Sequence, residues 1–160
     1  MSPDEYEHVV SEIVADICKH APQLAAVRPI FGRTSKAFGK SGYKHQIDVF
    51  FRTEKEIYVI ECKRWKDRIG VAEVLVLAAR ARDIADANKG KNVHAILAST
   101  QGVSREAKKL AQHFGIQIEI VQSANEFGMQ IGKLISVGLY NKAVATDSID
   151  MQIRKKSHGG

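Results

Sequence analysis

Cysteine is scarce in this sequence, with Cys18 and Cys62 the only two among 160 residues. Neither belongs to a CxxC motif or to a cluster of cysteines and histidines, so the pattern predicts neither a disulfide framework nor a zinc site. Both are expected to be reduced thiols in a cytoplasmic protein. The six histidines are scattered without an HExxH motif or similar spacing, so each is expected to be structural or solvated.

Long apolar runs are also missing. No stretch is long enough to cross a bilayer, and residues 1–10 lack the basic start and apolar core of a signal peptide. The sequence therefore predicts no membrane association. We expect a single domain over residues 1–145 and a disordered basic tail over residues 146–160.

Positive charge exceeds negative charge, and the formal net charge is +6 at pH 7. This balance weakly favours polyanionic partners, and the position of the charges is more informative than their sum. One basic cluster contains Arg33, Lys36, Lys40 and Lys44, and a second contains Lys63, Arg64, Lys66 and Arg68. The two clusters lie on either side of an apolar stretch. The candidate contacts to a phosphate backbone are Lys40, Lys44, Arg64 and Lys66.

Hydrophobic periodicity and turn signals predict alternating helices and strands. Helices are expected over residues 4–20, over residues 71–88, from the N-cap Ser104 to Gly115, and over residues 123–140. Strands are expected over residues 45–52, 56–63, 93–99 and 116–121, after a short strand and a flexible loop within residues 27–44. The first two of these strands form an antiparallel hairpin, and helices join the later ones. We therefore expect an α/β fold with a mixed central sheet and helices on both faces.

The expected hairpin brings charged residues together. Paired residues of a hairpin point to the same face, and a loop at residues 53–56 pairs Arg52 with Ile57. The same register places Asp48 opposite Glu61 and Gln46 opposite Lys63. The opposite face is apolar throughout and carries Ile47, Val49, Phe51, Tyr58, Ile60 and Cys62. The polar groups therefore gather at one end of one face.

Two carboxylates that face each other across strands, with Cβ atoms roughly 4.5–5.5 Å apart, destabilise the pair unless positive charge relieves them. A divalent cation or Lys63 would supply that charge. Mg²⁺ takes one or two carboxylates with water and phosphate, so Asp48, Glu61 and the carbonyl of Cys62 are candidate ligands. Lys63 would orient the attacking water or stabilise charge that develops on a phosphodiester.

The pattern "IDV…IECK", from Asp48 to Lys63, resembles the PD-(D/E)XK nuclease superfamily, and most closely the Mrr-type restriction endonuclease catalytic domain. The resemblance covers roughly residues 4–121. The segment "YEHVV" resembles the first helix of the family, "GKSGYKHQIDVFF" the glycine-rich loop before the catalytic strand, and "ASTQGVSREAKKLAQHFGIQI" the strand, turn and helix near its end.

This resemblance implies a three-layer α/β/α core with an antiparallel catalytic hairpin. It implies a Mg²⁺-dependent DNA endonuclease of the restriction or defence type, with Mn²⁺ as a substitute cation. Asp48 and Glu61 would be metal ligands, Lys63 catalytic and Glu7 a further carboxylate at the metal. The sequence departs from the family pattern at Ile47, which stands where the superfamily name has proline.

Other interpretations stay open. A charged strand end with a surface pair between Glu61 and Lys63 would give the same local pattern. The chain would then be a silent nuclease-fold module that binds DNA or a protein, and a structure-specific nuclease of the Holliday-junction kind is a third alternative. Cutting of both strands would favour a homodimer, with residues 71–88 and 123–140 as candidate interfaces. Target recognition would need a separate domain or subunit.

Overall fold

The strands and helices follow the order expected from the sequence, with one break. The structure is a computed structural model that describes residue 12, residues 15–19, 30–31, 35–63 and 68–120, and residue 126. Its elements are β1 (Ile30–Phe31), β2 (Lys36–Phe38), β3 (Lys44–Gln46), β4 (Val49–Arg52), β5 (Glu56–Cys62), α3 (Val71–Ala87), β6 (Asn92–Ser99), α4 (Arg105–Phe114) and β7 (Gln117–Ile120). None of the helices in these parts of the chain has the length and hydrophobicity to cross a membrane.

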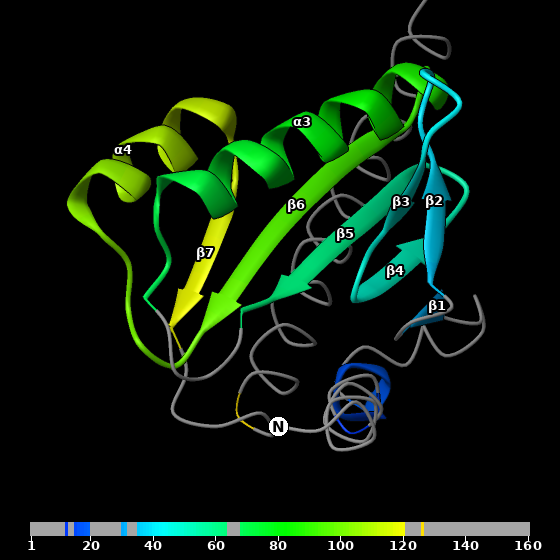
Figure 1. Cartoon of the computed structure of the whole chain (residues 1–160). Coiled ribbons are helices and arrows are strands. Elements are labelled where there is room, and N and C mark those ends of the chain that lie inside the picture. Colours follow the sequence, from blue (N-terminus) through cyan, green and yellow to red (C-terminus); the bar gives the residue numbers. More distant parts are fainter. Residues whose placement is uncertain are drawn as a thin grey trace, which may run out of the picture.

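A mixed five-stranded sheet forms the centre of the fold, in the order β1-β4-β5-β6-β7 (Figure 1). Strand β4 is antiparallel to both β1 and β5, whereas β6 is parallel to β5 and to β7. Helices α3 and α4 make the two connections between the parallel strands and lie side by side on one face of the sheet. The expected α/β fold with a mixed central sheet is confirmed.

The two helices have the limits that the sequence predicts. Helix α3 ends at Ala87, and Gly90 beyond it adopts a positive φ of 89°. At the start of α4, the Ser104 hydroxyl accepts a hydrogen bond from the N–H of Ala107 at 3.1 Å. Gly115 ends α4 in the left-handed conformation, with φ of 67°, which glycine adopts without steric cost. Of the expected helices at 4–20 and 123–140, only residues 12, 15–19 and 126 are described, and these are helical.

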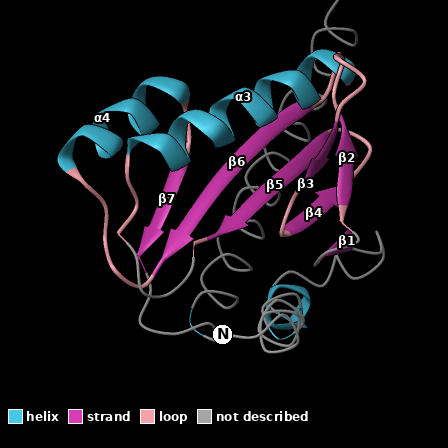
Figure 2. Ribbon diagram, viewed as in Figure 1, coloured by secondary structure: helices cyan, strands magenta, loops and turns pink. Residues whose placement is uncertain are grey.

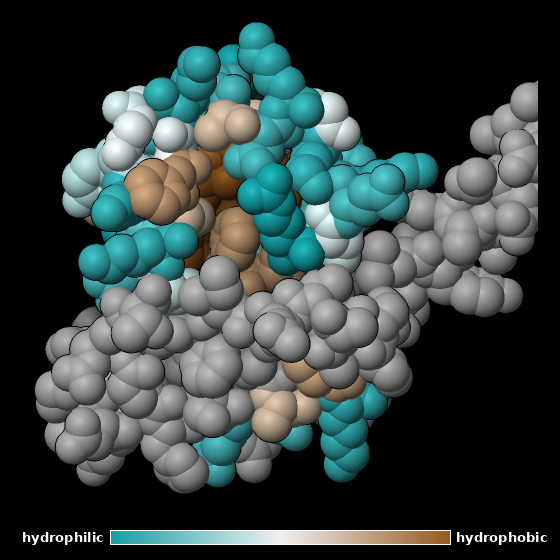
Figure 3. All heavy atoms as spheres, turned by 90° about the vertical axis from the view of Figure 1, so that its right-hand side faces the viewer, coloured by the Kyte–Doolittle hydropathy of each residue, from teal (hydrophilic) through white to brown (hydrophobic). Residues whose placement is uncertain are grey.

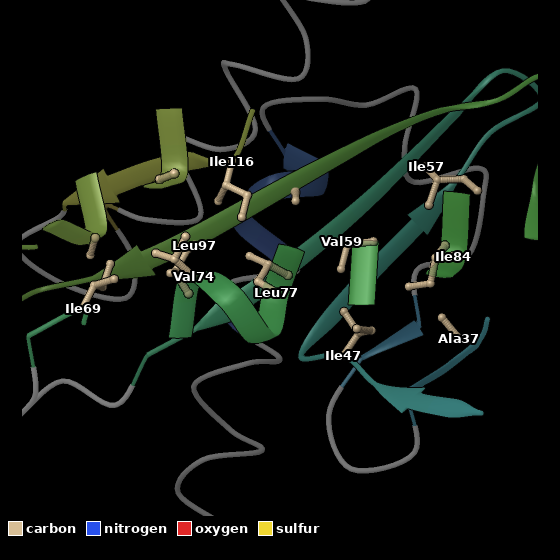
Figure 4. Close-up of a cluster of buried hydrophobic side chains, with 13 residues drawn as sticks. Ala37, Ile47, Ile57, Val59, Ile69, Val74, Leu77, Ile84, Leu97 and Ile116 are labelled. Carbon is tan, nitrogen blue, oxygen red and sulfur yellow. The ribbon is translucent and has the colours of Figure 1, made fainter. Parts of the chain in front are cut away.

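A buried apolar cluster joins α3 to the sheet (Figure 4). Ile57 and Val59 of β5 and Leu97 of β6 project toward Val74 and Leu77 of α3, and all of them are at most 3% exposed. Alternate residues of a strand share a face. The next two residues in this alternation after Val59 are Glu61 and Lys63, so the tertiary structure places both charges beneath α3.

The predicted strand over residues 45–52 is wrong, because the chain leaves the main sheet at Ile47 and Asp48. Strand β3 pairs with β2 in a separate two-stranded sheet, and β4 begins only at Val49 (Figure 2). The N–H of Ile47 donates to the carbonyl of Ser35 at 3.2 Å. The side chain of Ile47 belongs to the α3-facing core rather than to the face of Val49 and Phe51, where the sequence had placed it.

The segment expected to be a short strand and a flexible loop is more regular than predicted. Residues 27–44 contain β1, β2 and the first residue of β3. Strands β2 and β3 pair Lys36 with Gln46 and Phe38 with Lys44. The expected pairing of Gln46 with Lys63 is therefore wrong, and the N–H of Lys63 instead donates to the Ala98 carbonyl at 2.8 Å.

Candidate active site

The register expected for the catalytic hairpin is confirmed across β4 and β5. The pairs run from Arg52 with Ile57 to Val49 with Ile60. Asp48 directly precedes β4, and its Oδ2 accepts a hydrogen bond from the N–H of Cys62 at 2.6 Å. This bond holds the Asp48 carboxyl group at the carboxyl end of β5, beside Glu61.

Helix α3 supplies a partner for each charge at the end of β5. The guanidinium of Arg80 donates to a carboxylate oxygen of Glu61, and the ammonium of Lys63 donates to a carboxylate oxygen of Glu73. The other carboxylate oxygen of Glu73 accepts from the N–H of Gly70 at 3.0 Å, at the start of the helix. Glu73 and Arg80 lie about two helical turns apart and so face the same side of α3.

Glu61 is held in an environment that disfavours its charged form. Burial first, and the nearby Asp48 carboxylate second, raise the pKa of Glu61 to about 8, while Arg80 opposes this rise. The side chain of Glu61 is 18% exposed. The negative charge of the carboxyl pair is therefore only partly compensated by the protein itself.

The pKa values of the neighbouring Glu73 and Cys62 are also shifted. The hydrogen bond from Lys63 lowers the pKa of Glu73, which keeps that carboxylate ionised and the pair intact. Burial raises the pKa of the Cys62 thiol well above its usual range, so the thiol stays neutral. Cys62 therefore serves the site through its backbone and its bulk rather than as a nucleophile.

These groups line a pocket between β5 and α3 with a volume of about 260 Å³. Its lining residues are Glu61, Cys62, Lys63, Ala72, Glu73, Val76, Leu77, Arg80 and Leu97. Both ion pairs thus face one opening, with apolar side chains as its floor. Such a pocket presents two cations and two carboxylates to a ligand of limited size.

The donor set fits a cation that brings most of its own ligands. Within the described residues, no group of three or more His, Cys, Asp and Glu side chains lies close enough to hold a metal ion. Asp48 and Glu61 nevertheless form a carboxyl pair whose mutual repulsion contributes to the raised pKa of Glu61. Mg²⁺ commonly binds one or two carboxylates and takes its remaining ligands from water and substrate phosphate. The pair meets that requirement.

The other candidate site residues fall into two groups. Glu7, Arg64 and Lys66 lie outside the described residues. Lys40 and Lys44 are exposed on the β2–β3 hairpin and do not line the pocket. Their expected role as contacts to a phosphate backbone therefore stays a prediction.

Sequence reasoning missed Glu73 and Arg80. The signal was present, because both are charged residues within a helix that is otherwise rich in alanine, valine and leucine, and their spacing puts them on one helical face. The sequence alone gave no reason to join that face to the end of β5.

Three comparisons relate the chain to known proteins. A family model, Mrr_cat, described as a restriction endonuclease, matches residues 1–126. No curated protein matches the chain significantly. Among solved structures, a protein of unknown function, AF1548, is 21% identical with a TM-score of 0.50 over 71% of this chain and 56% of its own. Can2 from Sulfobacillus thermosulfidooxidans, solved with cyclic tetra-adenylate, is 20% identical with a TM-score of 0.50 over 79% of this chain and 34% of its own.

A repair endonuclease from Pyrococcus abyssi is 19% identical, with a TM-score of 0.45 over 68% of this chain and 45% of its own. The chain thus spans 56% of the first of these solved structures and less of the other two. The likeness to AF1548 and Can2 indicates a shared fold.

Proposed function

This chain belongs to the Mrr-type restriction endonuclease family, and on that premise we propose that it is a divalent-cation-dependent endonuclease that hydrolyses phosphodiester bonds of DNA. The suspected family and the restriction-endonuclease-like α/β fold are both confirmed. The enzymes of this family are nucleases of the restriction or repair type.

One observation carries the proposal. The Asp48 and Glu61 carboxyl groups lie together at the end of β5, and the Lys63 ammonium lies on the same pocket wall as Glu61. In the proposed enzyme, Asp48 and Glu61 hold the cation, with Mg²⁺ as the expected ion and Mn²⁺ as its substitute. The bound ion stabilises negative charge on the phosphate and lowers the pKa of a water molecule.

Lys63 and Arg80 then have defined tasks. Lys63 donates to the attacking water or to a phosphate oxygen, and its ion pair with Glu73 keeps the ammonium inside the pocket until substrate enters. Arg80 balances the charge of Glu61 in the absence of a cation. When a cation takes over that role, the Arg80 guanidinium is available to a phosphate oxygen. In this proposal Glu73 is therefore a positioning residue for Lys63, whereas Arg80 contacts the substrate itself.

The test is cleavage of supercoiled plasmid and linear DNA with Mg²⁺, with Mn²⁺ and with a chelator. We expect the cation to be required, and Asp48→Asn or Lys63→Ala to slow cleavage by at least about a hundredfold. Asp86→Asn and Lys108→Ala, which change the same residue types at exposed positions of α3 and α4, serve as matched controls and should cleave like wild type. Equal cleavage by all five proteins would show that another site or a contaminant is responsible.

A silent DNA-binding module is the second candidate, and the ion pairs favour it. Glu61 and Lys63 each already have a partner on α3, so part of the charge in the pocket is balanced without a cation. For a pure binder, affinity for DNA would be the same with and without Mg²⁺ and would survive Asp48→Ala. A titration of labelled DNA under both conditions separates the two functions.

A further inference from the structure

The hairpin of β2 and β3 carries a surface that the proposed chemistry does not use. We define the aromatic–lysine surface as Lys36, Phe38, Lys40 and Lys44. Phe38 is 59% exposed and Tyr43 is 67% exposed, and all three lysines are exposed. Figure 3 faces the side on which β2 and β3 lie in Figure 1, and hydrophobic side chains on its described part are bordered by hydrophilic ones.

The alternation of the strand separates this surface from the core. Ala37 is 5% exposed and belongs to the α3-facing core, so its neighbours Lys36 and Phe38 point to solvent. Lys44 pairs with Phe38 across the hairpin and its ammonium lies 5.1 Å from the centroid of the Phe38 ring. Tyr43 meets the His45 ring edge-on, at 5.0 Å between centroids. Tyr43 therefore lies on the side of the hairpin that turns to α3, and the Phe38 ring is the one presented among the lysines.

Asp83 of α3 holds the tip of this hairpin in place. Its carboxylate accepts hydrogen bonds from the Ser41 N–H at 2.9 Å and the Ser41 hydroxyl at 2.6 Å, and it pairs with His45 at 2.7 Å. Gly39 packs so closely that a Cβ there would lie 1.7 Å from an Asp83 oxygen. A hairpin fixed in this way loses little conformational entropy when a ligand binds.

The rise of helix α3 gives the distance between the tip of the β2–β3 hairpin and the pocket. Asp83 follows Glu73, the partner of Lys63, by about three turns of α3, which places the hairpin tip roughly 15 Å along the helix from the Lys63 end of the pocket and about one turn beyond Arg80. At about 3.4 Å per nucleotide along a strand, this corresponds to roughly four to five nucleotides. A strand whose phosphate lies at Lys63 therefore reaches the hairpin within half a helical turn.

We propose that the aromatic–lysine surface binds unpaired bases of a DNA substrate, roughly four to five nucleotides from the scissile phosphate, and so selects DNA with a single-stranded segment. The inference rests on the proposed nuclease function and names its substrate class. Every base has a π-face for the Phe38 ring, but a fully paired duplex keeps those faces stacked inside the helix. The lysines bind the adjoining phosphates, whatever the sequence.

Affinity without a divalent cation tests the inference separately from cleavage. Fluorescence anisotropy compares a fully paired duplex with a duplex of the same length that has a central unpaired segment. We expect Phe38→Ala to weaken binding to the unpaired DNA about five- to a hundredfold, with less than about a threefold change for the duplex. Phe114→Ala, at an aromatic ring that is 47% exposed on α4, is the matched control and should leave both affinities unchanged.

The outcomes distinguish this inference from the proposed function. Wild-type affinity of Phe38→Ala, equal losses on the two DNAs, an equal loss from Phe114→Ala, or no binding of either DNA by wild type would overturn it. If wild type cleaves DNA but Phe38→Ala keeps the wild-type preference, the nuclease function stands and the inference fails. If no DNA is cleaved but the selective loss of affinity is found, the surface binds as proposed and the nuclease function fails.

Discussion

Glu61 shows how a single residue is shaped by groups from three parts of the chain. Asp48 comes before β4, Arg80 lies on α3, and the strand itself buries the carboxyl group. Two of these influences raise the pKa of Glu61 and one lowers it. A carboxyl group under such opposed influences changes its protonation state in the neutral range, where an exposed glutamate does not.

The stability of the fold should therefore depend on the protonation of Glu61. Because the folded pKa of about 8 exceeds the pKa of 4.5 of an ordinary glutamate, the folded state binds more protons between these values. This contribution to stability is fully present below about pH 4.5 and is lost as pH rises toward about 8. We expect the free energy of unfolding of wild type to fall more steeply over this range than that of Glu61→Gln, as measured by urea denaturation at a series of pH values.

The exposed carboxylate Glu106 on α4 provides the control for this comparison. Glu106→Gln should keep the pH profile of wild type, since residue 106 is exposed to solvent. Parallel profiles for wild type and Glu61→Gln would show that the carboxyl group is not held as described.

Helix α3 links two features that lie far apart in the sequence. It provides Glu73 and Arg80 to the pocket, and its last turns provide Asp83 to the β2–β3 hairpin. Hydrogen bonds from Ser41 first, and from His45 second, lower the pKa of Asp83 to about 2. The anchor of the hairpin therefore stays ionised at every physiological pH.

The anchor predicts a specific effect of a small substitution. Gly39→Ala should destabilise the fold by about 1–3 kcal/mol, because the added Cβ would lie 1.7 Å from the Asp83 carboxylate. In the Asp83→Ala background the same substitution should cost clearly less, since the clashing atoms are gone. A double-mutant cycle measured by urea denaturation checks this coupling, and strictly additive effects would contradict the contact.

On the scale of the whole molecule, one core supports both the sheet and the pocket. Leu77 is 1% exposed, belongs to the cluster beneath α3 and also lines the pocket. Leu75 lies on the same helix but is 44% exposed. The two leucines therefore separate the contribution of packing from that of helix propensity.

Leu77→Ala should lower the free energy of unfolding by about 2–5 kcal/mol, because it removes a buried side chain and leaves a cavity. Leu75→Ala should lower it by about 1 kcal/mol or less, because most of the lost contact is with solvent. Urea denaturation of the two variants beside wild type makes the measurement. Similar losses for both would mean that α3 is packed in another orientation.

Much of the fold was accessible from local sequence patterns. The limits of α3 and α4 followed from apolar periodicity and from the caps at Ser104 and Gly115, and the structure agrees with them within about one residue. The register of β4 and β5 followed from a loop that leaves little choice of pairing. These features depend on neighbours along the chain, so the sequence carries them directly.

The break at Ile47 and Asp48 shows the limit of such reasoning. Periodicity predicts one continuous strand there, but the chain instead turns Ile47 into the core under α3 and pairs β3 with β2. Packing against residues far away in the sequence fixes this turn, and a short stretch of sequence carries no information about such contacts. The predicted register of β4 and β5 is nevertheless correct, because it depends on the loop at the other end of the hairpin.

The sequence by itself determined which charged groups the end of β5 carries and that Asp48 would lie beside Glu61. Only the tertiary structure decided what surrounds them, namely Arg80 on Glu61 and Glu73 on Lys63. It also decided that Lys40 and Lys44 lie on an anchored hairpin along α3. The physical reason is that pairing within a hairpin follows from chain geometry, whereas the contacts of α3 follow from how its buried face packs on the sheet.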